Sequence, residues 1–125
     1  MVAADTSVLI PYFNGEKSDD LKVLDYALEL SKLVLPPIVI TEILRSPKAT
    51  PLLIYNLSSL PKLKIKKDYW FRAAENGRLL LEKGLKAALA DTLIAQSCID
   101  HDVQLITRDG DFRHFAKYCG LKIYK

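Results

Sequence analysis

Acidic residues beside apolar segments are the first candidates for chemistry in this sequence, because an unpaired carboxylate is costly to bury. Five acids fit this description: Asp5, Glu42, Asp91, Asp109 and Asp111. Carboxylate oxygens with no competing cysteine or histidine are the donors that Mg²⁺ and Mn²⁺ prefer. Such an ion lowers the pKa of bound water and offsets charge on a phosphoryl oxygen, and phosphodiester hydrolysis needs both effects. The acids therefore indicate metal-assisted hydrolysis, provided that the fold brings them together.

Three of these acids also have ordinary structural explanations. Asp5 could cap the helix that follows it, and Asp91 could cap a helix beginning at Thr92. Glu42 could form a helix-surface ion pair with Arg45, three positions later. Apolar residues surround Glu42 in the helical register, which weakens that explanation. The small residues around Asp91 predict a close helix contact, where its carboxylate would need a compensating partner.

The other two acids flank Gly110 just after an apolar segment. The dipeptide Asp109-Gly110 is a common turn sequence, and one of the two acids could cap the helix that starts near Phe112. A cap and a turn do not require both Asp109 and Asp111. Either acid could therefore serve as a metal ligand.

The elements that position these acids alternate between short apolar strands and helices. Strands are predicted over residues 2–4, 34–35, 63–65, 104–107 and 121–124. Helices are predicted over residues 6–13 (capped by Thr6 or Ser7), 19–32, from Pro36-Pro37 to near Pro47, 51–60, 68–81, 86–100 and 112–118. This alternation predicts an α/β fold with a mainly parallel sheet and helices on both faces. Sites in such folds lie at the carboxyl ends of strands, so we expect 2–4 and 104–107 to be neighbouring central strands.

Composition limits the class of protein. The chain has 125 residues, 50% of them hydrophobic, which is typical of one folded domain and excludes disorder. No apolar run is long enough to cross a bilayer, and the first residues lack the basic segment of a signal peptide. Cys98 and Cys119 stand in apolar surroundings, so we expect free thiols in a cytoplasmic protein.

The net charge of +3 is compatible with a polyanionic partner if basic residues cluster. They do cluster in one segment, at Lys62, Lys64, Lys66 and Lys67. The alternative is a solvated strand edge, since edge lysines discourage aggregation.

Four segments together resemble the PIN-domain family, most closely the VapC-like toxins of toxin–antitoxin pairs. They are VAADTSVLI, ITEILRS, LADTLIAQS and LITRDGDF. The resemblance covers essentially the whole chain as a single domain, and it implies a three-layer α/β/α sandwich with about five parallel strands. It also implies a ribonuclease that depends on Mg²⁺ or Mn²⁺. By position, Asp5, Glu42, Asp91 and Asp109 match the catalytic and metal-binding acids, Asp111 could share the role of Asp109, and Thr6, Ser7 and Thr107 match supporting polar positions.

The resemblance further implies a homodimer and a cognate antitoxin. The helix over residues 19–32 has apolar residues on more than one face, and together with Ile54, Tyr55 and Leu57 it predicts a hydrophobic interface. We expect an antitoxin segment to cover apolar surface near the active site. Residues 49–67 align poorly with the family, and we expect this departure to affect the partner-binding surface.

Other classes were weighed against this interpretation. An aspartyl-phosphate phosphatase usually needs a second acid two residues after Asp5, where Ser7 stands. A phosphate-receiver domain would need an acidic pair before the first helix and an aspartate after the third strand, and neither is present. A PIN nuclease in RNA processing and a catalytically inactive PIN module that binds RNA or protein remain alternatives.

Overall fold

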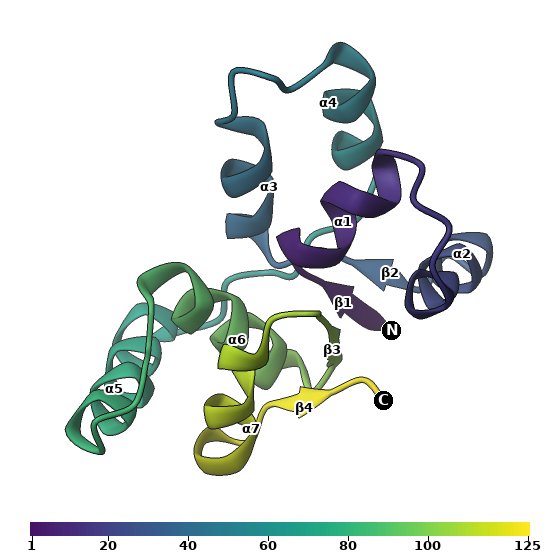
Figure 1. The fold of residues 1–125 in the computed structure, drawn as a ribbon. Coiled ribbons are helices and arrows are strands. Elements are labelled where there is room, and N and C mark those ends of the chain that lie inside the picture. The colour runs from purple at the N-terminus through teal and green to yellow at the C-terminus, as the bar shows by residue number, and fades with distance from the viewer.

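The structure, a computed structural model, describes all of residues 1–125. Its strands are β1 (Val2–Ala4), β2 (Leu33–Val34), β3 (Gln104–Ile106) and β4 (Lys122–Ile123). Its α-helices are α1 (Thr6–Phe13), α2 (Lys22–Glu29), α3 (Pro37–Leu44), α4 (Pro51–Ser58), α5 (Tyr69–Glu82), α6 (Leu89–His101) and α7 (Arg113–Cys119). Two short 3₁₀ helices, η1 (Asp19–Leu21) and η2 (Gly110–Phe112), precede α2 and α7. Figure 1 shows the short strands at the centre with the helices around them.

The strands form one parallel sheet in the order β2-β1-β3-β4. Successive residues of a strand point to opposite faces, yet Ala3 and Ala4 are both buried, as are Leu105 and Ile106. Helices therefore cover both faces, and the predicted α/β/α arrangement is confirmed. As predicted, β1 and β3 are neighbouring central strands, with Ala4 paired to Ile106.

The sheet has four strands because the one expected over residues 63–65 does not form. Only an isolated parallel bridge joins Leu35 to Lys62, and the N–H of Leu63 donates to the carbonyl of Leu35 at 2.9 Å. Leu63 is buried but Ile65 is exposed, so a single apolar side chain anchors this segment to the core. The chain therefore leaves the sheet after one bridge.

The structure decides between the caps predicted for the first helix. Asp5 caps α1, as its structural explanation predicted, and Thr6 and Ser7 do not, because the carboxylate of Asp5 accepts the N–H of Ser7 at 3.1 Å. The helix expected over residues 19–32 is η1 followed by α2, and it ends at Glu29. No helix in the chain is both long enough and apolar enough to cross a membrane.

The apolar side chains expected to form an interface in this part of the chain are exposed only in part. Tyr26 on α2 and Leu30 just after it are exposed, and so are Ile54 and Tyr55 on α4. Leu57, however, is completely buried and belongs to the core. Its inclusion in an interface was wrong, because α4 turns this side chain inward toward the other buried residues.

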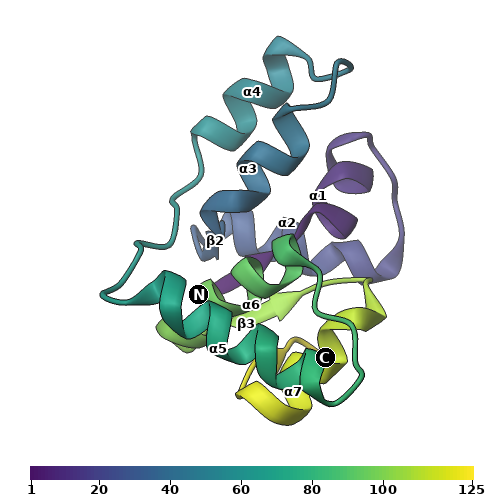
Figure 2. The same cartoon turned by 90° about the vertical axis from the view of Figure 1, so that its left-hand side faces the viewer.

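The helix that carries Asp91, α6, packs closely against α5 (Figure 2). It begins at Leu89, three residues after the predicted start at Lys86. A Cβ atom placed on Gly77 of α5 would lie 3.2 Å from Cγ2 of Thr92 on α6. The two helices thus meet at a point where a side chain on α5 would force its neighbour to move.

A polar cluster fixes the register of these two helices. Arg72 on α5 donates two hydrogen bonds to the carboxylate of Asp100 on α6, which is almost completely buried. Gln96 donates to Asp100 at 2.9 Å and accepts from Asn76 at 2.7 Å. Burial opposes ionisation of Asp100, but the hydrogen bonds from Arg72 and Gln96 outweigh it and hold its pKa below the usual value. The cluster therefore holds in place the helix that carries Asp91.

We predict that Gln96→Leu lowers the free energy of unfolding by about 2 kcal/mol, since it removes the hydrogen bond that Asn76 donates and one of the three that the carboxylate of Asp100 accepts. Gln104→Leu, the same change at an exposed glutamine, should alter it by less than about 0.5 kcal/mol. Urea denaturation followed by far-UV circular dichroism measures both. Equal effects of the two variants would contradict a structural role for the cluster.

Candidate active site

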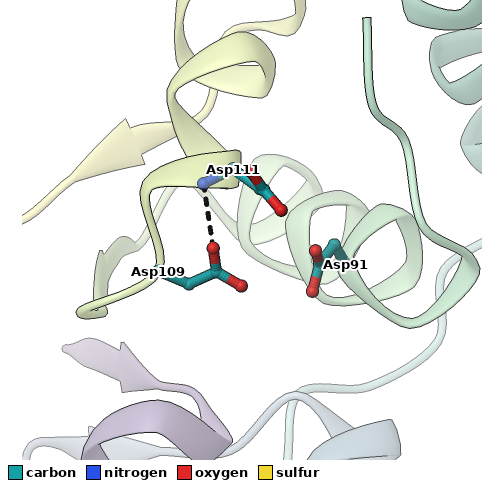
Figure 3. Close-up of side chains that lie close together, drawn as sticks. All are labelled: Asp91, Asp109 and Asp111. Atoms are coloured by element: carbon teal, nitrogen blue, oxygen red, sulfur yellow. Dashed lines mark hydrogen bonds between the residues drawn. The ribbon is translucent and has the colours of Figure 1, made fainter.

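Three aspartates converge beside the carboxyl end of β3. Figure 3 shows Asp91 from the first turn of α6 facing Asp109 and Asp111, which come from the turn into η2. One carboxylate oxygen from each lies within 4.8 Å of the others. Asp91 accepts no hydrogen bond from the protein and does not cap α6, whose N-cap is Ala88, so the alternative explanation of Asp91 as a helix cap is wrong.

Asp5 lies at the end of β1 with only 4% of its surface exposed. Its Oδ1 accepts hydrogen bonds from the N–H and the hydroxyl of Ser7, at 3.1 and 2.6 Å. Its Oδ2 accepts from the hydroxyl of Thr107, at 2.6 Å. Since Thr107 directly follows β3, this contact joins the ends of the two central strands.

Glu42 on α3 is the fourth expected acid. Its Oε1 accepts a hydrogen bond from the hydroxyl of Thr6 at 3.0 Å, and it forms no ion pair with Arg45. The ion-pair explanation of Glu42 is therefore wrong. The contact with Thr6 instead connects α3 to the start of α1, next to Asp5.

Hydroxyl groups continue this network into the turn that carries Asp109. The N–H of Arg108 donates to Oγ of Ser7 at 2.9 Å, and the N–H of Asp109 donates to Oγ1 of Thr107 at 3.0 Å. Oδ1 of Asp109 accepts the N–H of Asp111 at 2.9 Å. The two residues that support Asp5 thus also fix the backbone of the second acidic segment.

The arginine in this turn does not neutralise the acids. The guanidinium of Arg108 pairs with Glu16 and Asp20, at 2.5 and 2.6 Å, in the segment between α1 and α2. The sequence analysis missed this tether, because 88 residues separate Arg108 from Asp20.

The five acids share one electrostatic environment. Burial first, and then the charges of neighbouring carboxylates, raise the pKa of Asp91 to about 6; these neighbours are Asp109, Glu42, Asp111 and Asp5. Burial also raises the pKa of Asp5, against the hydrogen bonds from Ser7 and Thr107, and Asp109 adds to the rise. Repulsion of this kind is expected where carboxylates are brought together without a cation.

These residues fit a divalent metal ion. Their donors are all carboxylate oxygens, which suits Mg²⁺ or Mn²⁺, and none of the five acids forms an ion pair with a protein cation. Asp91, Asp109 and Asp111 make up the closest group, and Asp5 and Glu42 lie outside it. The geometry alone therefore does not decide between Asp109 and Asp111, because both face Asp91.

Fold and site together define an α/β domain with an acidic centre at the carboxyl edge of a parallel sheet. The chain belongs to the PIN domain family, whose sequence model matches residues 2–118. Proteins of this family are generally nucleases. Membership of the family therefore excludes the two alternatives of a phosphatase and a phosphate-receiver domain.

Solved structures of toxin–antitoxin proteins share the fold. VapBC2 from Rickettsia felis, bound to a DNA fragment from its promoter, is 21% identical with a TM-score of 0.76, over 99% of this chain and 98% of that one. VapBC-5 from Mycobacterium tuberculosis is 18% identical with a TM-score of 0.72, over 99% and 97%. A toxin–antitoxin complex from Klebsiella pneumoniae is 24% identical with a TM-score of 0.65, over 97% and 95%. No curated protein matches the sequence.

The raised pKa of Asp91 predicts a pH-dependent stability. Because its pKa is higher in the folded state than the ordinary value of 3.8, ionisation of Asp91 destabilises the fold, and the cost grows as the pH rises from about 4 through about 6. Asp91→Asn removes the charge and breaks no hydrogen bond. In metal-free buffer at pH 7.5 it should raise the free energy of unfolding by about 1–2 kcal/mol.

Chemical denaturation of both proteins in EDTA between pH 4 and pH 8 measures this effect. The advantage of the variant should shrink toward zero near pH 4. A constant difference across this range, or a variant less stable than the wild type at pH 7.5, would show that repulsion at Asp91 is not the cause.

Proposed function

We propose that this chain is a divalent-metal-dependent endoribonuclease and the toxin of a toxin–antitoxin pair. The nuclease part is supported above all by five carboxylates in one environment with no protein cation among them. Membership of the PIN domain family supports the same class of reaction. The choice of RNA and of Mg²⁺ or Mn²⁺ is our inference from the family and from the all-oxygen donor set.

We infer that the five acids have different roles in binding the metal ion. Asp91, Asp109 and Asp111 present oxygens close enough to hold one ion. Asp5 and Glu42, set further back, would complete the site directly or through water, since Mg²⁺ usually keeps several waters. When bound, the ion would lower the pKa of an attacking water and offset charge on the phosphate.

The surrounding side chains orient these acids. Both oxygens of Asp5 already accept hydrogen bonds, from Ser7 and Thr107, so this carboxylate is held in one orientation. Thr6 restrains Glu42 in the same way. Asp91 has no such bond and is free to accept a hydrogen bond from water or substrate. Preorganised groups of this kind need little rearrangement during the reaction.

The toxin part of the proposal has independent support. All three structures reported above come from toxin–antitoxin systems. We propose that exposed apolar side chains on α2 and α4 serve a homodimer contact or an antitoxin segment, since large exposed apolar groups are typical of interfaces. Two free cysteines and an RNA substrate are consistent with action in the cytoplasm.

We predict that the protein cleaves a single-stranded RNA with Mn²⁺ or Mg²⁺ and is inactive in EDTA. Asp5→Asn should reduce cleavage at least about 100-fold, because it removes a charge from the site while keeping the shape. Circular dichroism should show an intact fold. Full activity of this variant, or of the wild type in EDTA, would end the metal-nuclease proposal.

A second comparison separates the two neighbouring aspartates. Asp109→Asn should reduce cleavage more than Asp111→Asn, since the charge of Asp109 acts more strongly on Asp91 than that of Asp111 does, and it also acts on Asp5. Titration of Mn²⁺ by calorimetry should rank the two variants in the same order. A larger loss for Asp111→Asn would assign the main role to Asp111. If neither the wild-type protein nor either variant binds Mn²⁺, the chain is better described as a PIN module that only binds RNA or protein.

A further inference from the structure

Helix α7 packs against α5 (Figure 2), and basic side chains lie on both elements where they meet. Arg113 and Lys117 lie on α7, and Lys83 is the C-cap of α5. None of the three forms an ion pair with an acid. In contrast, Arg72 and Arg108 are both paired with carboxylates. The free cations in this region are therefore available to an external anion.

An aromatic ring holds two of these cations together. Nζ of Lys83 lies 4.6 Å from the ring centroid of Tyr118, and Nζ of Lys117 lies 5.2 Å from it. Each contact is a favourable cation–π interaction. Both ammonium groups keep a positive charge with which an external phosphate would pair. A hollow lined by Leu85, Arg113, His114, Lys117 and Tyr118 lies at this place.

This basic face begins at the acidic site. η2, which carries Asp111, runs directly into α7. The guanidinium of Arg113 lies beside Gly110, the residue between Asp109 and Asp111: its terminal nitrogen would lie 3.3 Å from a Cβ placed on Gly110. Lys117 follows Arg113 by four residues, about 6 Å along the same helix face. That distance spans roughly two stacked nucleotides at about 3.4 Å each.

We propose that Lys83, Arg113 and Lys117, with Tyr118 in contact with both lysines, bind backbone phosphates of single-stranded RNA beside the bond cleaved at the acidic site. The inference rests on the proposed ribonuclease function and adds the direction in which the substrate leaves the site. Its physical reason is electrostatic: a polyanion must approach a cluster of carboxylates, and neighbouring unpaired cations offset that repulsion.

The lysine-rich segment identified in the sequence does not fill this role. Lys66 donates to the carbonyl of Asp100 at 2.9 Å, near the end of α6. Asp91 lies in the first turn of that helix, nine residues earlier and therefore about 13 Å away along its axis. Lys62, Lys64 and Lys67 are exposed in the same segment, so they provide a control with an equal change of charge.

The test compares two triple variants of the full chain. The first is Lys83→Gln/Arg113→Gln/Lys117→Gln, and the control is Lys62→Gln/Lys64→Gln/Lys67→Gln. Binding of a fluorescein-labelled, 12-nucleotide single-stranded RNA is measured by anisotropy in EDTA, between 50 and 300 mM KCl. Cleavage by each protein is then measured with Mn²⁺, and Mn²⁺ affinity by calorimetry.

The first variant should bind this RNA at least about tenfold more weakly at 50 mM KCl, and its slope of log affinity against log salt should fall by about 2. Its KM should rise with little change in kcat, because contacts away from the cleaved bond contribute uniform binding. The control should stay within about threefold of the wild type, and all three proteins should bind Mn²⁺ equally. Tyr118→Leu should weaken binding several-fold without changing the salt slope.

If the wild type cleaves RNA with Mn²⁺, two results would overturn the inference and leave the ribonuclease proposal intact. The first is that the first variant binds RNA as tightly as the wild type does. The second is that both triple variants bind RNA more weakly by the same factor. A wild-type protein that neither binds nor cleaves this RNA would overturn both. Loss of Mn²⁺ binding in the first variant would instead show that these residues support the acidic site, and would also count against the inference.

Discussion

The concentration of negative charge at one edge of the sheet is the constraint on which the rest of the structure depends. Five carboxylates from β1, α3, α6 and the turn after β3 share one environment, and no protein cation neutralises them. Such an arrangement costs stability in the absence of a counter-ion. It persists because the surrounding fold holds each acid in place, and this supports a site built for a divalent cation and an anionic substrate.

Hydrogen bonds near the acids and packing between helices together hold the acids in place. Ser7 and Thr107 bind Asp5 and also fix the backbone of the next acidic turn, so that β1 and β3 present their acids as one unit. The hydrogen bonds from Arg72 on α5 and Gln96 on α6 to Asp100 hold α6, the helix that carries Asp91, against α5. The cations lie outside the acid cluster, either tied to other acids, as in Arg108, or free beside the site.

The sequence predicted the parts of this arrangement that depend on local patterns. Apolar strands followed by acids indicated that Asp5 and Asp109 end neighbouring central strands, because parallel strands end at one edge. It did not predict that Leu57 is buried or that residues 63–65 leave the sheet, since both depend on tertiary contacts that a short window does not encode. The approach of Lys83 to α7 could not be predicted either, because a loop, α6, β3 and η2 separate them in the chain.

The most direct test of the account is the position of a metal ion. Crystals grown with Mn²⁺ and measured at the manganese absorption edge should give an anomalous peak among Asp91, Asp109 and Asp111, within roughly 2–2.3 Å of at least two carboxylate oxygens. Crystals of Asp91→Asn under the same conditions should show a much weaker peak or none. A wild-type crystal with no peak at this cluster, or with its only peak elsewhere, would contradict the claim that these acids form a metal site.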